Sequence, residues 1–251
     1  MLDTLDHGPV RELRLARPPA NALTPELLAT LAAAVASPAQ GVKALVLSGA
    51  PGFFSGGLDI PRLLTLERDA IRETWVALYD LLRTLAASPL PIAAAITGHA
   101  PAGGCVLSLF CDLRVMAEGD YKIGVNEVAV GIPLPPVIHL ALARQVGPRQ
   151  AEQLNTTGVL VSSSDALRLG LVDETVPLEQ VVPRAIERLE ALLALPPRAY
   201  AETRRRARAD LVALFDTVDD DEIETVLDDW WSEETQSILR AVAERLTKKK
   251  G

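Results

Sequence analysis

The chain has 251 residues, of which 49% are hydrophobic and 23% are charged, and its formal net charge is −8. This composition is typical of a globular protein and argues against a disordered chain. The acidic balance argues against a nucleic-acid-binding protein, because phosphate groups require a dense basic face, and no apolar run is long enough to cross a bilayer. We therefore expect neither nucleic acid nor a membrane among the partners of this protein.

Short apolar runs alternate with helical patterns in the first half of the chain. Strands are expected at residues 10–15, 44–48 and 92–96. A helix is expected to begin after Thr24, a good N-cap, with Pro25 at its first position. A longer helical pattern fills residues 69–87.

Two glycine-rich segments follow the second and third of these strands. Residues 49–57 and 98–102 are predicted to be loops, because glycine and proline interrupt regular structure. Each segment continues into a glycine pair and then a helical pattern. The order of strand, turn, Ala-Pro loop, glycine pair and helix therefore occurs twice. We interpret this order as an internal repeat, with a weaker third copy at residues 113–130.

The rest of the chain is predicted to be mostly helical. A short helix is expected to begin at residues 162–165 and to end at Gly170, followed by a strand at residues 171–176. Longer helices are expected at residues 179–195, 198–214 and 219–246. The lysines at residues 248–250 are interpreted as a solvated basic end of the last helix.

The sequence does not indicate a metal site or a disulfide framework. The two cysteines and three histidines lack the spacing of a zinc site, and two cysteines do not suggest a disulfide-stabilised secreted protein. The N-terminal residues lack the pattern of a signal or transit peptide. We therefore expect a cytoplasmic protein that binds no metal.

The glycine pairs at residues 56–57 and 103–104 give the first indication of chemistry. A glycine pair that enters a helix lets a ligand approach the backbone and leaves N–H groups unpaired. Two such ends directed at one point would form an oxyanion hole, with the amides of Leu58 and Gly103 as donors. Either pair alone is more often a tight turn, but two pairs in matched contexts favour the functional interpretation. Ser55 has no evident His–Asp set and no Gly-x-Ser-x-Gly motif is present, so an enolate is the expected anion.

Glu127 is the candidate base for forming such an enolate. It is an acid within the otherwise apolar residues 125–133, where burial would raise its pKa and make it a better base near neutral pH. The alternative, an exposed residue of a strand, fits the pattern equally well.

Six segments of the chain carry a resemblance to a known family. They are residues 17–23 (RPPANAL), 53–59 (FFSGGLD), 98–105 (GHAPAGGC), 111–114 (CDLR), 124–127 (GVNE) and 166–173 (ALRLGLVD). Together they resemble the crotonase superfamily, the enoyl-CoA hydratase/isomerase family. The resemblance implies an α/β fold, a right-handed spiral of ββα repeats with a helical C-terminal part that packs in trimers. Because the composition changes near residues 177–183, we expect an acyl-CoA-binding core at residues 1–177 and a helical subdomain at residues 178–251.

The resemblance also implies a ligand and the residues that hold it. The family binds acyl-CoA thioesters, so coenzyme A is part of the substrate and no separate cofactor is expected. The expected assembly is a homotrimer or a dimer of trimers. The family's oxyanion donors fall on Leu58 and Gly103, and its acid falls on Glu127. The positions that we carry over as substrate-binding are Ala20, Ala22, Ser55, Gly56, Gly57, Asp59, Pro101, Gly104, Asn126 and Pro133.

The branch of the family depends on a second acid. Hydratases of this family use two glutamates, which fall here on Val106 and Glu127, and valine cannot transfer a proton. The resemblance therefore favours a Δ3,Δ2-enoyl-CoA isomerase, in which Glu127 removes the C2 proton and returns it at C4. One alternative is an enoyl-CoA hydratase or another enolate-forming acyl-CoA lyase, with an unrecognised partner for Glu127. Another is a weakly active or non-catalytic CoA-binding subunit of an assembly.

Several neighbouring residues have two interpretations each. Asn126 either orients Glu127 or occupies a turn, and His139 is either a second acid–base group or a packed helix residue. Asp59 is also interpreted as the acid that starts a helix, and Arg62 either meets a phosphate or is solvated. The candidates for the acyl tunnel, which fit the core equally well, are Trp75, Phe110, Leu134 and Trp230.

Overall fold

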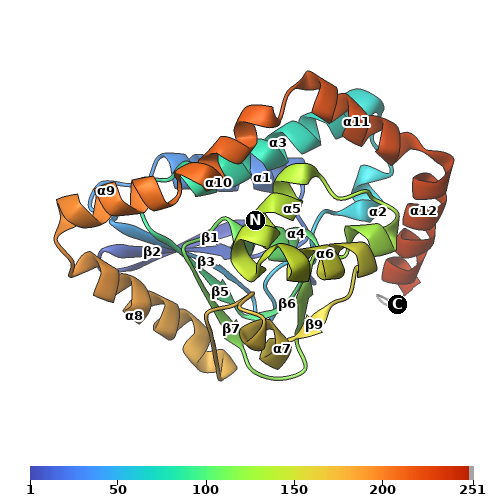
Figure 1. Ribbon diagram of the computed structural model, residues 1–251. Coiled ribbons are helices and arrows are strands. Elements are labelled where there is room, and N and C mark those ends of the chain that lie inside the picture. Colours follow the sequence, from blue (N-terminus) through green and yellow to red (C-terminus); the bar gives the residue numbers. More distant parts are fainter. Residues whose placement is uncertain (249–251) are drawn as a thin grey trace.

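Two sheets of mixed direction form the centre of the computed structural model, which describes residues 1–248 (Figure 1). The larger sheet contains β1 (Leu2–His7), β2 (Val10–Leu15), β3 (Ala44–Gly49), β5 (Ile92–Ile96), β7 (Leu113–Ala117) and β10 (Glu174–Val176) in this order. Its strands run parallel to their neighbours, apart from the antiparallel pair β1 and β2. The smaller sheet contains β4 (Gly52–Phe53), β6 (Gly98–Pro101), β8 (Lys122–Gly124) and β9 (Val161–Ser162).

The chain winds between the two sheets in successive ββα units. β3 is followed by β4 and helix α2 (Ile60–Leu63), and β5 is followed by β6 and helix α4 (Gly103–Leu109). In the third unit, β7 is followed by β8 and the 3-10 helix η1 (Glu127–Val130). In each unit the first strand joins the larger sheet and the second joins the smaller one. The predicted internal repeat, including its third copy, is confirmed.

The two loops predicted at residues 49–57 and 98–102 are wrong in part, because they contain β4 and β6. These strands pair in parallel, with Gly52 opposite Gly98. A Cβ atom on Gly98 would lie only 2.1 Å from the carbonyl carbon of Gly52. The glycines that indicated loops in fact allow two strands to approach closely, a role that strand propensity does not report.

Helices cover both faces of the larger sheet. Helices α1 (Pro25–Ala36) and α3 (Arg68–Ala87) pack against each other on one face, and α8 (Val181–Leu193) packs on the other. Along β3, Leu45 and Leu47 belong to the first layer, whereas Val46 faces the cluster that contains α8. Every residue of β3 is buried, which explains why residues 44–47 are continuously apolar and do not alternate.

The C-terminal helices are shorter than the sequence predicts. They are η2 (Leu178–Gln180), α8, α9 (Pro197–Ala207), α10 (Ala209–Ala213), η3 (Leu214–Thr217), α11 (Asp220–Trp231) and α12 (Glu233–Lys248). The helix predicted at residues 198–214 is interrupted at Arg208. The one predicted at residues 219–246 is interrupted at Ser232, whose hydroxyl accepts a hydrogen bond from the Thr235 amide at 3.2 Å.

Three further helices lie between the spiral and this C-terminal part. They are α5 (Pro136–Val146), α6 (Pro148–Thr157) and α7 (Ser163–Arg168). The Ser162 hydroxyl accepts from the Asp165 amide at 3.1 Å, so the predicted start of α7 is confirmed. The strand predicted at residues 171–176 is formed only in its second half. The predicted basic end at residues 248–250 lies mostly outside the described residues.

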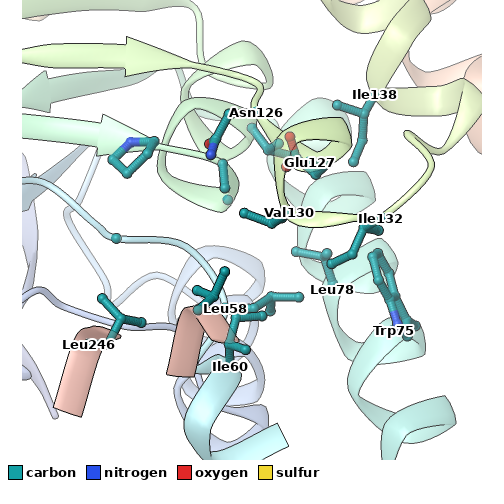
Figure 2. A pocket seen from close by; sticks show the side chains of 16 residues that line it. Leu58, Ile60, Trp75, Leu78, Asn126, Glu127, Val130, Ile132, Ile138 and Leu246 are labelled. Carbon is teal, nitrogen blue, oxygen red and sulfur yellow. The ribbon is translucent and has the colours of Figure 1, made fainter. Parts of the chain in front are cut away.

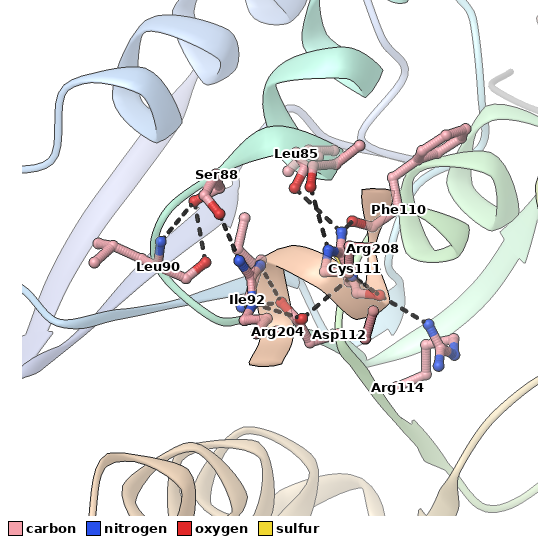
Figure 3. A network of polar contacts seen from close by, with 12 residues as sticks. Leu85, Ser88, Leu90, Ile92, Phe110, Cys111, Asp112, Arg114, Arg204 and Arg208 are labelled. Carbon is pink, nitrogen blue, oxygen red and sulfur yellow. Dashed lines mark hydrogen bonds and ion pairs between the residues drawn. The ribbon is translucent and has the colours of Figure 1, made fainter. Parts of the chain in front are cut away.

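A buried group of charges ties α9 and Arg208 to the core (Figure 3). Asp112, just after α4, accepts two hydrogen bonds from Arg204 at 2.8 Å each and one from Arg208 at 3.2 Å. It also accepts from the Ile92 amide at the start of β5 at 2.8 Å. Arg208 donates further to carbonyl oxygens at the ends of α3 and α4. This network fixes α4, the helix that begins at Gly103, against the sheet and the C-terminal helices.

The boundary at residue 177 remains a prediction. Helix α8 lies beyond it and shares a buried apolar cluster with β3, β5 and β7. No helix in the described part of the chain is both long and apolar enough to span a membrane.

Candidate active site

A cavity of about 190 Å³ lies where the smaller sheet, η1, α2, α3 and α12 meet (Figure 2). Most of its wall is apolar and consists of Leu58, Ile60, Trp75, Leu78, Val106, Val130, Ile132, Ile138, Val242 and Leu246. The rest of the wall consists of Gly56, Pro101, Ala102, Gly103, Asn126 and Glu127. Among the residues that the structure describes, Glu127 is the only ionisable side chain on this wall. The cavity can therefore enclose an apolar group beside one carboxyl.

Glu127 is the first residue of η1, which is capped at its other end by Gly131 with a φ of 79°. Only 7% of Glu127 is exposed, and its Oε2 atom has no hydrogen-bond partner within residues 1–248. Burial raises the pKa of Glu127 to about 7, although the backbone amides of Glu127 and Asn126 act in the opposite direction. The interpretation of Glu127 as an exposed strand residue is wrong. Its carboxyl is suited to exchange a proton near neutral pH.

The amides of Leu58 and Gly103 belong to the same wall. Leu58 forms a short bridge with Leu23, in which the Leu23 amide donates to the Gly57 carbonyl at 2.8 Å and the Asp59 amide donates to the Leu23 carbonyl at 3.0 Å. The two hydrogen bonds of this bridge use the Gly57 carbonyl and the Asp59 amide. The Leu58 amide between them has no acceptor among the described residues. Gly103 is the first residue of α4, so its amide is one of the donors that a helix leaves unpaired.

Glycines allow these two amides to come close together. A Cβ atom on Gly57 would lie 3.0 Å from the Gly103 nitrogen, and one on Gly103 would lie 3.1 Å from the Gly57 Cα. Gly57 also has a φ of 83°, which L side chains rarely adopt. Ala102, directly before α4, has a φ of 47°, a strained conformation of the kind that concentrates at functional sites. Two unpaired donors at one place can stabilise an oxygen that becomes negative.

Three predicted substrate-binding residues lie behind this wall and support it. The Ser55 hydroxyl donates to the Asn21 carbonyl at 2.9 Å and accepts from the Gly57 amide at 3.2 Å. A Cβ atom on Gly104 would lie 2.3 Å from the Ser55 carbonyl oxygen. Ser55, Gly57 and Gly104 therefore hold the two donor segments together and do not themselves line the cavity.

Asp59 and Arg62 are engaged with partners in the chain. The Asp59 carboxyl accepts from the Arg62 amide at 3.4 Å at the start of α2, and from Arg17 at 2.5 Å. The interpretation of Asp59 as a helix-start acid is confirmed. The Arg62 guanidinium pairs with Glu26 at an exposed position, which agrees with its interpretation as a solvated residue.

The other predicted substrate-binding residues divide into two groups. Those that line the cavity are Gly56, Pro101 and Asn126. Those that do not are Ala20, Ala22 and Pro133, the last of which is exposed. The Ala20 carbonyl accepts from the Gly56 amide at 2.7 Å, which places it one residue behind the wall. Asn126 acts on the Glu127 carboxyl through its backbone amide.

Of the candidates for an acyl wall, Trp75 lines the cavity. Phe110 and Trp230 lie in the core, and Leu134 packs against the core outside the cavity. His139 also lies outside the wall, where its Nδ1 shares a hydrogen bond of 2.7 Å with Asn155. Its interpretation as a packed helix residue agrees with this position.

Two cavity residues on α12 are missed by the sequence analysis. Val242 and Leu246 are four residues apart and therefore share one face of this helix. The signal for them is an apolar stripe that continues from Ile238 and Leu239. Such a stripe predicts that a helix packs on something, but not that it packs over a cavity built near the other end of the chain.

Comparisons with known proteins place this geometry in context. A family model described as enoyl-CoA hydratase/isomerase matches residues 7–242. The chain is 31% identical over 248 residues to human mitochondrial enoyl-CoA delta isomerase 1, which covers 96% of this chain and 82% of the human protein. It is 33% identical over 195 residues to the probable enoyl-CoA hydratase EchA17 of Mycobacterium tuberculosis, which covers 76% of this chain and 74% of that protein.

The comparison of structures agrees with the comparison of sequences. The crystal structure of human mitochondrial Δ3-Δ2-enoyl-CoA isomerase superimposes with a TM-score of 0.94 at 29% identity. The match covers 100% of this chain and 99% of that chain. The predicted fold class is confirmed, while the similar proteins carry the names of two different reactions.

Proposed function

Since this chain belongs to the enoyl-CoA hydratase/isomerase family of the crotonase superfamily, we propose that it is a Δ3,Δ2-enoyl-CoA isomerase. The observation that supports the proposal most directly is the single ionisable side chain, Glu127, among the described residues of the cavity wall. Moving a double bond needs one group that removes a proton and returns it. Adding water needs a further group that holds and activates the water molecule.

In the proposed reaction, the thioester oxygen of a 3-enoyl-CoA accepts hydrogen bonds from the Leu58 and Gly103 amides. The Glu127 carboxylate removes a proton from C2, and the electrons of that C–H bond move onto the thioester oxygen as an enolate forms. The protonated Glu127 then delivers its proton to C4 while the thioester carbonyl is restored. The double bond moves from C3–C4 to C2–C3, and no atom is gained or lost.

The two parts of the site meet the energetic needs of this reaction. Each amide donor of an oxyanion hole typically contributes ~10²–10³ in rate, because it is already directed at the oxygen where charge develops. The pKa of Glu127, raised to about 7 by burial, lets the same group act as base and then as acid at neutral pH.

Val106 supports isomerisation over hydration. It lines the cavity and is 1% exposed. The family resemblance implies that it stands where the hydratases carry their other glutamate. The similarity to EchA17 keeps hydration as the second candidate.

An assay with two substrates tests the proposal. The protein is mixed with 3-hexenoyl-CoA, and the absorbance of the conjugated thioester is followed. We expect it to rise. In a separate reaction with 2-hexenoyl-CoA, loss of that absorbance with formation of 3-hydroxyhexanoyl-CoA by mass would instead establish hydration. Silence in both reactions, with hexanoyl-CoA still bound, would point to a non-catalytic CoA-binding subunit.

The expected assembly and location remain proposals. A homotrimer, or a dimer of trimers, is proposed from the same family resemblance and can be tested by sedimentation velocity. A cytoplasmic location likewise remains a proposal, which cell fractionation can test.

A further inference from the structure

The cavity is closed at one end and open at the other. Leu246, on α12, is 46% exposed. At the other end Trp75, Leu78 and Ile132 are 3%, 3% and 6% exposed. Figure 2 shows Trp75 beyond Leu78 and Ile132 as seen from Glu127, with Leu246 on the opposite side. An apolar chain that passes Glu127 in the direction of Ile132 therefore ends against the Trp75 ring.

Trp75 is held firmly in this position. It lies within α3, and its ring packs against Tyr79 one turn later, with ring centroids 6.2 Å apart. Towards the start of the same helix, Arg68 and Arg72 form ion pairs with acidic residues of α11. Because α3 is packed on α1 and joined to α11, the backbone that carries the indole is fixed. The ring itself is 3% exposed and therefore confined by its neighbours.

We propose that Trp75 limits the length of the acyl chain that the cavity accepts, and that short-chain acyl-CoA thioesters are the substrates. The cavity of about 190 Å³ is smaller than the ~300–1,000 Å³ of typical ligand pockets. Part of it must also hold the thioester group beside the two amides. This inference rests on the proposed function only in taking an acyl chain as the occupant.

The test compares two buried tryptophans. Trp75→Leu puts a smaller side chain at the closed end of the cavity and so lengthens the space. Trp230→Leu removes an indole that is 1% exposed and lies outside the cavity. The measured quantity is the ratio of kcat/KM for 3-dodecenoyl-CoA to that for 3-hexenoyl-CoA. We expect this ratio to be well below one in the unaltered protein and to rise at least about tenfold in Trp75→Leu, since one methylene in an apolar pocket already changes kcat/KM by ~10–200-fold.

The controls separate a change of the wall from general damage. Trp230→Leu should leave the ratio unchanged even if it lowers both rates. Trp75→Phe, which removes less of the wall, should shift the ratio in the same direction by a smaller factor. A ratio near one in the unaltered protein, or the same ratio in both leucine variants, would overturn the role of Trp75.

A binding measurement keeps the inference testable if neither substrate is turned over. Calorimetric titration with hexanoyl-CoA and dodecanoyl-CoA compares the two chains without chemistry. Trp75→Leu should increase the affinity for dodecanoyl-CoA relative to hexanoyl-CoA, and Trp230→Leu should not. Absence of turnover with this shift present would reject the proposed reaction but keep the chain-length limit. Absence of the shift would reject the limit.

Discussion

Glu127 is unusual among the acids of this chain, because its carboxyl is buried and has no charged partner on the cavity wall. Burial raises its pKa, whereas most acids with a shifted pKa here lie at the surface and have it lowered by an arginine. A carboxyl whose pKa is raised by burial, next to unpaired amide donors, is the expected signature of a proton-transfer site.

The pH dependence of turnover should follow this raised pKa. The base is active as the carboxylate, and below pH 7 the buried Glu127 holds a proton that blocks it. We therefore expect kcat/KM for 3-hexenoyl-CoA to increase about tenfold per pH unit up to a midpoint near 7 and then to level off. Initial rates between pH 5 and 9 measure this. A midpoint near 4.5, the ordinary value for a glutamate, would mean that the carboxyl is solvated during turnover.

Replacing the carboxyl should separate catalysis from binding. Glu127→Gln keeps the shape of the side chain but cannot accept a proton, so we expect kcat to fall by ~10²–10⁴ while hexanoyl-CoA still binds. The variant should also unfold at a higher temperature than the unaltered protein at pH 8. At that pH the folded protein must bury a charged Glu127, and glutamine removes this cost. The difference should shrink at pH 5, where the folded protein keeps Glu127 neutral. An active Glu127→Gln variant would remove Glu127 from the mechanism.

At the level of the elements, the close approach of β4 and β6 with their following turns aligns the two amide donors. Gly57→Ala would place a methyl group 3.0 Å from the Gly103 nitrogen and from the Ala102 Cβ. We expect this substitution to push the Leu58 segment away from α4 and to lower kcat/KM by ~10²–10³, the usual effect of losing one oxyanion donor.

Gly147→Ala is the matched control for this substitution. Gly147 has a φ of 84°, close to the 83° of Gly57, but a Cβ atom there would meet nothing within 4 Å. Both alanines would be strained by the positive φ, and thermal unfolding measures the cost in each variant. Only Gly57→Ala should lose activity. Equal kcat/KM values for the two variants would show that the glycine contact does not align the donors.

Local signals in the sequence predict elements well where one residue type has one physical role. The Thr24 hydroxyl accepts from the Leu27 amide at 3.3 Å, as an N-cap should, and the apolar stripe of α1 is buried. Glycine has two roles, turning a chain and admitting a neighbouring backbone, and the second role produced the unpredicted β4 and β6. Helix breaks at Arg208 and Ser232 were also hidden, because neither residue type ends a helix by itself.

In the candidate site, too, some residues could be predicted from the sequence and others could not. Glu127 and the two glycine pairs could be found because a lone acid in an apolar run and a repeated pair are visible along the chain. Trp75 could only be ranked with three other large apolar residues, since cavity and core demand the same residue type. The contribution of Val242 required knowing where α12 folds back.

At the scale of the whole molecule, Asp112 joins segments that are far apart in the chain. Its side chain is 12% exposed and faces two arginines that are 9% and 8% exposed. Asp112→Asn would leave those cations buried without their counter-ion, and we expect the free energy of unfolding to fall by ~3–5 kcal/mol. Denaturant unfolding measures this change.

Glu202→Gln is the control for this loss. Glu202 pairs with Arg205 and Arg206 on the exposed side of α9, and its removal should barely change the free energy of unfolding. If Asp112→Asn unfolds at the same denaturant concentration as Glu202→Gln, the buried network does not hold α9 and α4 together.

The place of α12 over the cavity has a consequence for biosynthesis. Leu58, Gly103 and Glu127 leave the ribosome long before Val242 and Leu246. Until this amphipathic segment emerges and docks, one wall of the chamber is missing and solvent has access to the acid. We therefore expect the nascent polypeptide to acquire catalytic competence abruptly, once α12 has emerged, and not in proportion to its length.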